Sequence, residues 1–231
     1  MKREVREPAI YNAIITAVAT GHSRMSEIST KVGESTTVCS GYLKNLIDLG
    51  IIKKDTPYGE KASKKSIYSI EDNMFYFWYR FVLDNTSAIA RGTVNLVYKR
   101  IEAQLNDYMG RVFKEICTQY LWKLLLEGKM PIEFSSLGCW WGNDPRKKAQ
   151  TEIDIMGEQD SNSAIFAECK WRNENVDLDV LGTLVDRSGL FHYTKVHYFL
   201  FSKTGFTKGC MEKAGEMGNV TLVSYDDIVN S

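Results

Sequence analysis

The order of helical and β-like segments between residues 101 and 224 constrains the fold of this chain more than any other feature. Apolar residues recur every three or four positions over residues 101–126, which predicts one long helix. Short runs of β-forming residues and amphipathic helical stretches follow it. The predicted strands cover residues 132–141, 152–157, 164–171, 196–201 and 220–224, and the predicted helices cover residues 178–191 and 206–217. This α-β-β-β-α-β-α-β order predicts a mixed α/β domain whose sheet starts antiparallel and continues through a βαβ crossover.

The first 73 residues carry a different pattern, that of a winged helix-turn-helix. Three short helical segments are followed by two β-like runs, which a loop with Pro57 and Gly59 joins. The helices are predicted over residues 9–20, 25–32 and 36–49, and the strands over residues 51–54 and 66–70. Gly50 is expected just past the end of the third helix. The predicted fold class is α+β for this module and α/β for the rest of the chain.

The third helix and the wing of this module predict contact with DNA, because such a helix enters the major groove while the wing contacts the backbone. The candidate contact residues on the helix are Thr36, Thr37, Ser40 and Lys44, and those on the wing are Lys53, Lys54, Lys61, Lys64 and Lys65. The helix has no arginine to bind guanine edges, so base-specific recognition has weak support. A winged helix used for docking to another protein is the alternative.

An aromatic run over residues 72–82 links the two patterns. An exposed platform of this kind would suit single-stranded nucleic acid. The run has one arginine and continues into apolar sequence, so burial as a helix that joins the two modules is favoured. The more polar residues 84–100 predict a surface connection or short helices. The predicted domains are a winged helix over residues 1–73, an aromatic helical bridge over 74–100 and an α/β domain over 101–231.

The charge balance excludes a protein that coats nucleic acid by bulk charge, because 29 basic side chains face 29 acidic ones. The net charge is unevenly spread, at +2 over residues 1–73, +3 over 74–130 and −5 over 131–231. No stretch approaches the roughly 20 apolar residues that a bilayer crossing needs, and the first ten residues lack the apolar core of a secretory signal. A cytoplasmic location without a membrane partner is therefore expected.

The cysteine and glycine patterns exclude several kinds of site. The five cysteines are odd in number and never spaced as C-x-x-C, which argues against a disulfide framework and against a zinc ribbon. The chain has no Walker-type glycine loop and no G-x-G-x-x-G motif. No nucleotide site and no ATPase activity are therefore expected from this chain alone.

Acidic and basic side chains alternate with apolar ones on two adjacent predicted strands. In residues 166–171, the period-two alternation places Glu168 and Lys170 on one face of the strand. In the preceding strand it places Glu152 and Asp154 on one face, with Ile153 and Ile155 on the other.

These two strands predict a metal site if they form a hairpin. Asp154 and Glu168 would then converge on one hard cation, Mg²⁺ or Mn²⁺, with the backbone carbonyl of Cys169 as a further oxygen ligand. Lys170 would hold or deprotonate a water molecule, or balance the charge of a phosphoryl group. A solvated, salt-bridged strand face gives the same residue pattern, so this alternative stays open.

The acidic pair, the E-x-K strand and the element order together resemble the PD-(D/E)xK nuclease superfamily. More narrowly, the chain resembles the C-terminal region of the archaeal-type ATPases, in which an AAA-like, P-loop ATPase domain precedes a winged helix and a restriction-endonuclease-like domain. The segments that carry this narrower resemblance are residues 67–82, 110–115, 140–141, 152–155, 168–171 and 201–206.

The resemblance implies that Asp154 and Glu168 are metal ligands, that Lys170 is the catalytic lysine and that Glu115 is the helix carboxylate of many superfamily members. Two departures concern this site. Ile153 stands where the motif has proline, and Lys114 takes the place directly after a phenylalanine where the helix acid is usual.

The resemblance implies an ATPase domain that lies either in cis, in a longer protein, or in trans. It leaves two functions open for this chain. One is a DNA-binding, nuclease-like module that hydrolyses phosphodiesters with Mg²⁺, as a deoxyribonuclease does. The other is a non-catalytic DNA-binding or protein-docking module that keeps a relic nuclease fold.

Overall fold

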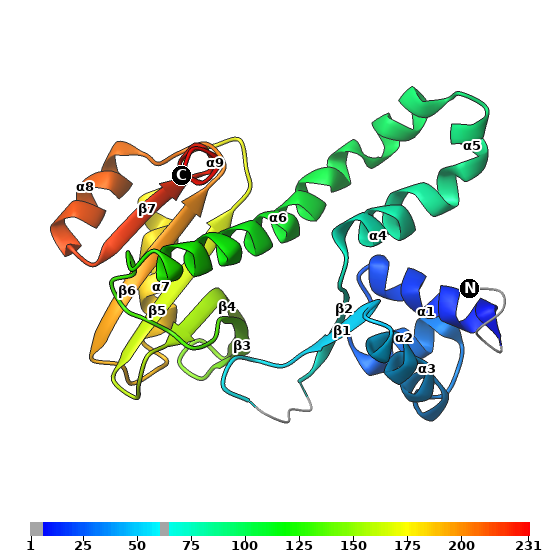
Figure 1. The fold of residues 1–231 in the computed structure, drawn as a ribbon, viewed down its shortest axis with the longest axis horizontal. Helices are drawn as coiled ribbons and strands as arrows, with labels where there is room; N and C mark the ends of the chain where they lie inside the picture. The colour runs from blue at the N-terminus through cyan, green and yellow to red at the C-terminus, as the bar shows by residue number, and fades with distance from the viewer. Residues whose placement is uncertain (1–6, 61–64) are drawn as a thin grey trace. The chain divides into compact units, whose positions relative to one another are not determined.

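The computed structural model describes residues 7–60 and 65–231, and this part of the chain forms two compact units (Figure 1). Among the described residues, the first unit contains residues 7–56, 60 and 65–104, and the second contains residues 57–59 and 105–231. Within the described ranges, no helix is both long enough and apolar enough to cross a membrane.

The first unit begins with the three helices and the two-stranded hairpin that the sequence predicts. The elements are α1 (Pro8–Ala19), α2 (Met25–Val32), α3 (Thr36–Asp48), β1 (Ile52–Asp55) and β2 (Ile67–Ile70), with β1 antiparallel to β2. The side chain of Ser35 caps α3 by accepting a hydrogen bond from the backbone N–H of Val38 at 3.3 Å. Gly50 follows α3 with φ of 67°, a conformation that glycine adopts without strain. This element order is that of a winged helix.

The aromatic run forms α4 (Asn73–Phe77) and a π-helical turn, η1 (Trp78–Val82), before η2 (Leu83–Asn85) and α5 (Thr86–Ala90). Tyr76, Tyr79 and Phe81 are buried, and the hydroxyl of Tyr79 donates a hydrogen bond to Asn12 Oδ1 on α1 at 2.8 Å. The run is therefore helical and partly buried within the first unit, and its role in joining the two modules stays a prediction. Phe75 and Phe77 are half-buried, and Trp78 has 48% of its surface exposed.

Helix α6 (Val94–Leu126) begins earlier than its apolar repeat predicts. The expectation of a surface connection or short helices over residues 84–100 is wrong from Val94 onward. Gly92, with φ of 78°, separates α6 from α5, and no proline or glycine interrupts the sequence from Val94 until Gly110. The polar side chains near its start therefore belong to an exposed helical segment rather than to a loop.

The second unit is built on a five-stranded mixed sheet, whose strand order follows the chain. Its elements after α6 are β3 (Gly138–Asp144), β4 (Ala149–Glu158), β5 (Ser163–Lys170), α7 (Leu178–Ser188), β6 (Lys195–Ser202), α8 (Lys208–Met217), β7 (Val220–Ser224) and α9 (Tyr225–Val229). The β3–β4 and β4–β5 pairs are antiparallel, whereas β5–β6 and β6–β7 are parallel. The predicted antiparallel start and βαβ crossover are confirmed.

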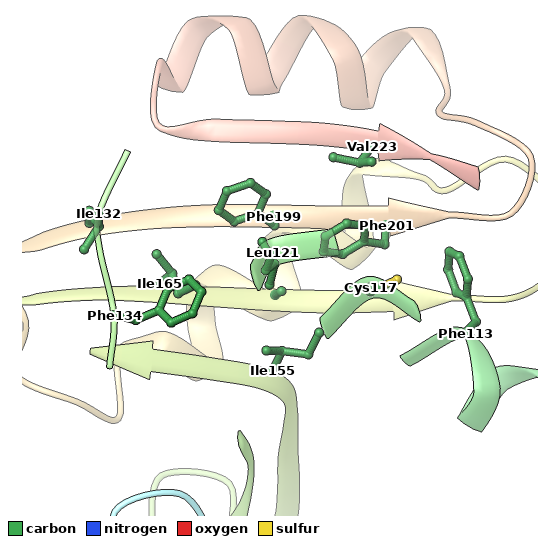
Figure 2. Close-up of a cluster of buried hydrophobic side chains, with 11 residues drawn as sticks. Phe113, Cys117, Leu121, Ile132, Phe134, Ile155, Ile165, Phe199, Phe201 and Val223 are labelled. Carbon is green, nitrogen blue, oxygen red and sulfur yellow. The ribbon is translucent and has the colours of Figure 1, made fainter. Parts of the chain in front are cut away.

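Two apolar clusters cover the two faces of this sheet. Figure 2 shows the first, in which Phe113, Cys117 and Leu121 of α6 pack against the sheet residues Phe199 and Phe201. The second places α7 and α8 against the opposite face, through residues that include Leu181, Leu184 and Cys210. Helices thus lie on both faces of the sheet, in a three-layer α/β arrangement, and most residues of β5 and β6 are buried.

Several predicted elements of this unit have boundaries that differ from the observed ones. The segment expected as a strand over residues 132–141 is irregular up to Gly138, where pairing with β4 starts. Ile132 and Phe134 are apolar because they are buried in the cluster under α6, and not because they belong to a strand. The helix expected over residues 178–191 ends at Ser188, because Gly189 caps it.

Candidate functional site

The candidate DNA-contact residues of α3 lie on its exposed side. Thr36, Thr37, Ser40 and Lys44 are exposed, while Cys39, Leu43 and Leu46 are buried in the first unit. Among the described residues Lys44 forms no ion pair, so its charge is not neutralised by a neighbouring carboxylate. The helix therefore presents a polar face with one positive charge.

The described wing lysines are only partly available as positive charges. Lys53 lies 3.9 Å from Glu71, and Lys65 lies 3.0 Å from Glu60. Lys54 is exposed, with its Nζ 6.0 Å from the centre of the Tyr68 ring. Lys61 and Lys64 lie outside the described residues. Exposed ion pairs of this kind are weak, so a phosphate group can compete for these lysines.

A β-bulge in β4 sets the direction of Asp154. Gly138 pairs with Met156 and Trp140 with Ile153, so β4 has one more residue than β3 between these pairs. The expectation that Ile153 and Ile155 share a face is wrong: Ile153 packs in the cluster under α7, and Ile155 packs in the cluster under α6. The strict alternation fails because a bulge adds a residue and re-aims the side chains beside it.

Both carboxylate oxygens of Asp154 have partners. Lys114 on α6 places its Nζ 2.6 Å from Oδ1, and the backbone N–H of Cys169 donates to Oδ2 at 2.9 Å. Asp154 is only 6% exposed. Burial opposes the charged form of Lys114, but the neighbouring Asp154 carboxylate outweighs this and raises the lysine pKa above its usual value. The ammonium and the carboxylate therefore form a strongly coupled pair.

Two cationic side chains contact Glu168. One lies two residues further along β5, and the other lies on α7. Lys170 donates to Oε1 at 2.5 Å, and Arg187 donates to Oε2 at 3.3 Å. The predicted placement of Glu168 and Lys170 on one strand face is confirmed. The pKa of Glu168 is raised above its usual value, first by burial and then by the negative charge of Asp154. The positive charges of Lys170 and Arg187 lower this pKa but do not outweigh the other two effects. Asp154 and Glu168 are thus close enough to feel each other's charge.

The side chains of Lys114, Asp154, Glu168, Lys170 and Arg187 make up a charged centre, and the role expected for the helix carboxylate Glu115 beside it stays a prediction. Glu115 forms an ion pair with Arg111 of its own helix at 3.9 Å. In the described part of the chain, no three carboxylate, imidazole or thiol side chains are grouped so that they could hold a metal ion. The Cys169 contact to Asp154 uses the backbone N–H, and the role expected for its carbonyl stays a prediction. As arranged, the donors do not fit Mg²⁺ or Mn²⁺, because all four carboxylate oxygens are engaged by other groups.

Sequence reasoning missed two members of this charged centre, Lys114 and Arg187. Lys114 directly follows Phe113, which belongs to the apolar repeat of α6. This position places the lysine at the edge of the helix face that packs on the sheet, and it is the signal that could have identified Lys114. Arg187 gave no such signal, since a basic residue in the last turn of a helix is common for other reasons.

Two basic side chains of the turn between β3 and β4, Arg146 and Lys147, are paired with carboxylates. Arg146 donates to Asp144 through Nε at 3.1 Å and Nη2 at 2.9 Å, and Lys147 lies 2.7 Å from Asp186. The hydrogen bonds from Arg146 lower the pKa of Asp144 to about 2. These contacts tie the β3–β4 turn to α7.

The fold and the charged centre define a protein in which a winged-helix unit precedes a three-layer α/β unit. Residues 78–180 match the family DUF234, described as archaea bacterial proteins of unknown function. The matched segment contains Lys114, Asp154, Glu168 and Lys170, whereas Arg187 lies beyond it.

A protein of Methanocaldococcus jannaschii, described as uncharacterized protein MJECL04, is 35% identical over 175 residues. The alignment covers 75% of this chain and 38% of that protein, so the chain spans well under half the length of the relative.

Two solved structures show looser likenesses. AF1548, a protein of unknown function, is 19% identical with a TM-score of 0.34, over 50% of this chain and 65% of its own. Protein VC1899 from Vibrio cholerae is 11% identical with a TM-score of 0.39, over 98% of this chain and 55% of its own. Neither likeness is close enough to carry an argument about function.

Proposed function

We propose that this chain binds duplex DNA through its first unit and uses its second unit as a non-catalytic, nuclease-like scaffold. The observation that carries the proposal is the exposed polar face of α3, with Thr36, Thr37, Ser40 and Lys44, in the second helix of a helix-turn-helix that a two-stranded wing follows. Two exposed lysines, Lys54 and Lys44, supply the attraction to phosphate, and Lys44 forms no ion pair with the residues that the structure describes.

The restriction-endonuclease-like assignment of the second unit is part of this proposal. It is supported by the α-β-β-β-α-β-α-β order, by the mixed sheet, and by Asp154, Glu168 and Lys170 on adjacent strands. The resemblance to the C-terminal region of archaeal-type ATPases motivates a further proposal, that an ATPase domain acts with this module in cis or in trans. The Methanocaldococcus relative extends well beyond the part that this chain matches, so a longer protein of this kind has room for another domain.

Neutralising Lys44 and Lys54 together, as Lys44→Gln/Lys54→Gln, is expected to weaken duplex binding at every sequence tested. Each lost phosphate contact should reduce the slope of log affinity against log salt concentration by about 1. Fluorescence anisotropy with a labelled duplex, at several salt concentrations and in EDTA, measures both quantities.

The matched control for this experiment is Lys208→Gln, which neutralises an exposed lysine on α8, far in sequence from the wing. The control should keep the affinity and the salt slope of the wild type. If the double variant also keeps both, the assigned DNA-binding face is wrong. If the wild type binds no duplex at low salt, the proposed function itself is wrong.

A second candidate function is divalent-metal-dependent phosphodiester hydrolysis at the α/β unit. The placement of Asp154, Glu168 and Lys170 together favours it, while the engaged carboxylate oxygens oppose it. We expect no cleavage of plasmid or linear DNA in Mg²⁺ or Mn²⁺ above the level of Asp154→Ala. Cleavage by the wild type that both Asp154→Ala and Lys170→Ala abolish would replace the non-catalytic proposal with the enzymatic one.

A further inference from the structure

The charged centre of the α/β unit contains its own cation next to Asp154. The Nζ atom of Lys114 lies 2.6 Å from Oδ1, on a carboxylate that is only 6% exposed. A divalent ion bound to the same oxygen would need to sit at about 2.1 to 2.6 Å from it. The two cations would therefore compete for one position.

The remaining carboxylate oxygens offer no free alternative. Asp154 Oδ2 accepts the backbone N–H of Cys169 at 2.9 Å, and both oxygens of Glu168 accept hydrogen bonds from Lys170 and Arg187. Three cationic side chains thus surround two carboxylates. A divalent ion entering this centre would meet these three positive charges.

The packing of α6 holds Lys114 at this position. Its neighbour Phe113 and Cys117, one turn later, are both fully buried in the cluster that attaches α6 to the sheet. The ammonium is therefore tethered to a fixed helix beside its carboxylate. A tethered group competes at a high effective concentration against an ion that must arrive from solution.

We propose that Lys114 is the resident counter-cation of Asp154 and that it determines the cation specificity of this centre by excluding divalent metal ions. This inference rests on the proposed non-catalytic role of the α/β unit. It assigns to Lys114 the place that a metal ion would otherwise take. The residue selects against metal rather than contributing to a metal site.

The test is a Mn²⁺ titration of the full chain, followed by electron paramagnetic resonance of the free ion. Wild type is expected to bind Mn²⁺ at this centre at least about tenfold more weakly than Lys114→Gln. The gain should disappear in Lys114→Gln/Asp154→Asn, because the ion would use the Asp154 carboxylate. Arg111→Gln is the matched control, since it removes one positive charge from the same helix one turn earlier.

Three results would overturn the inference. The first is equal Mn²⁺ affinity in wild type and Lys114→Gln. The second is an equal gain in Arg111→Gln, which would show a general charge effect. The third is a loss of Mn²⁺ affinity greater than about twofold in Asp154→Asn alone. This variant leaves Lys114 unchanged, so the result can be obtained even if Lys114→Gln fails to fold.

The proposed DNA-binding function is tested by a separate measurement. Duplex affinity in EDTA depends on the first unit in this proposal and should be the same in wild type and Lys114→Gln. Absence of duplex binding by the wild type would refute the proposed function. The Mn²⁺ affinities of the wild type and the four variants would still decide whether Lys114 excludes the metal.

Discussion

Replacement of Phe113 by alanine is expected to lower the free energy of unfolding of the second unit by about 3 to 5 kcal/mol. Phe113 is fully buried, and its ring lies 5.2 Å from the ring of Trp171 and 6.4 Å from that of Tyr225, centre to centre. It anchors α6 to the sheet in the cluster of Figure 2. Its loss removes apolar contacts and leaves a cavity that a stiff sheet cannot close.

Urea unfolding measured by tryptophan fluorescence tests this prediction in a Trp78→Phe background. The other four tryptophans, Trp122, Trp140, Trp141 and Trp171, all belong to the second unit, so the signal reports that unit alone. Leu126→Ala, on the same helix but 87% exposed, is the control and should change the free energy by less than about 0.5 kcal/mol. Equal effects of the two substitutions would contradict the packing of α6 described above.

The element order of both units could be predicted because periodicity reports which side of a segment is buried. The repeat of apolar residues along α6 and the β-forming runs of β4 to β7 gave the correct order of elements from α6 to β7, whereas the short α9 was not predicted. Boundaries failed where a residue is apolar for another reason. Ile132 and Phe134 are buried from an irregular segment, and periodicity alone does not distinguish such a segment from a strand.

The charged centre could be predicted only in part. Glu168 and Lys170 are two residues apart on a regular strand, so their shared face follows from local geometry. The direction of Asp154 depends on a bulge, and its partner Lys114 lies 40 positions earlier in the chain. Neither a bulge nor a contact between distant segments leaves a periodic signal in the sequence. The acids were therefore found, and the cation that neutralises one of them was not.

The Lys114–Asp154 pair is expected to give the second largest effect on stability. Lys114→Met should lower the free energy of unfolding by about 2 to 4 kcal/mol, because it leaves a buried carboxylate without its cation. This range is lower than the cost of breaking a fully buried ion pair, because solvent reaches the lysine side chain, of which 34% is exposed. Asp154→Asn should cost less, about 1 to 2 kcal/mol, since asparagine still accepts the N–H of Cys169.

The double variant Lys114→Met/Asp154→Asn tests whether these two costs arise from one interaction. Its cost should fall below the sum of the single costs by about 1 to 3 kcal/mol, which urea unfolding in the same Trp78→Phe background measures. A double variant close to wild-type stability would mean that the pair adds little to folding, as holds for many buried ion pairs. Its presence would then agree with a role in excluding metal ions.

The pH dependence of this coupling follows from the raised pKa of Lys114. Burial lowers that pKa and the Asp154 carboxylate raises it more, so the folded value lies above the unfolded one. The contribution of Lys114 is therefore complete below the unfolded pKa of about 10.4 and is lost only as the pH rises through the folded value. The coupling energy should be equal at pH 7 and pH 9. Strictly additive single costs at both pH values would show that Asp154 does not depend on Lys114, and its carboxylate would then be available to another cation.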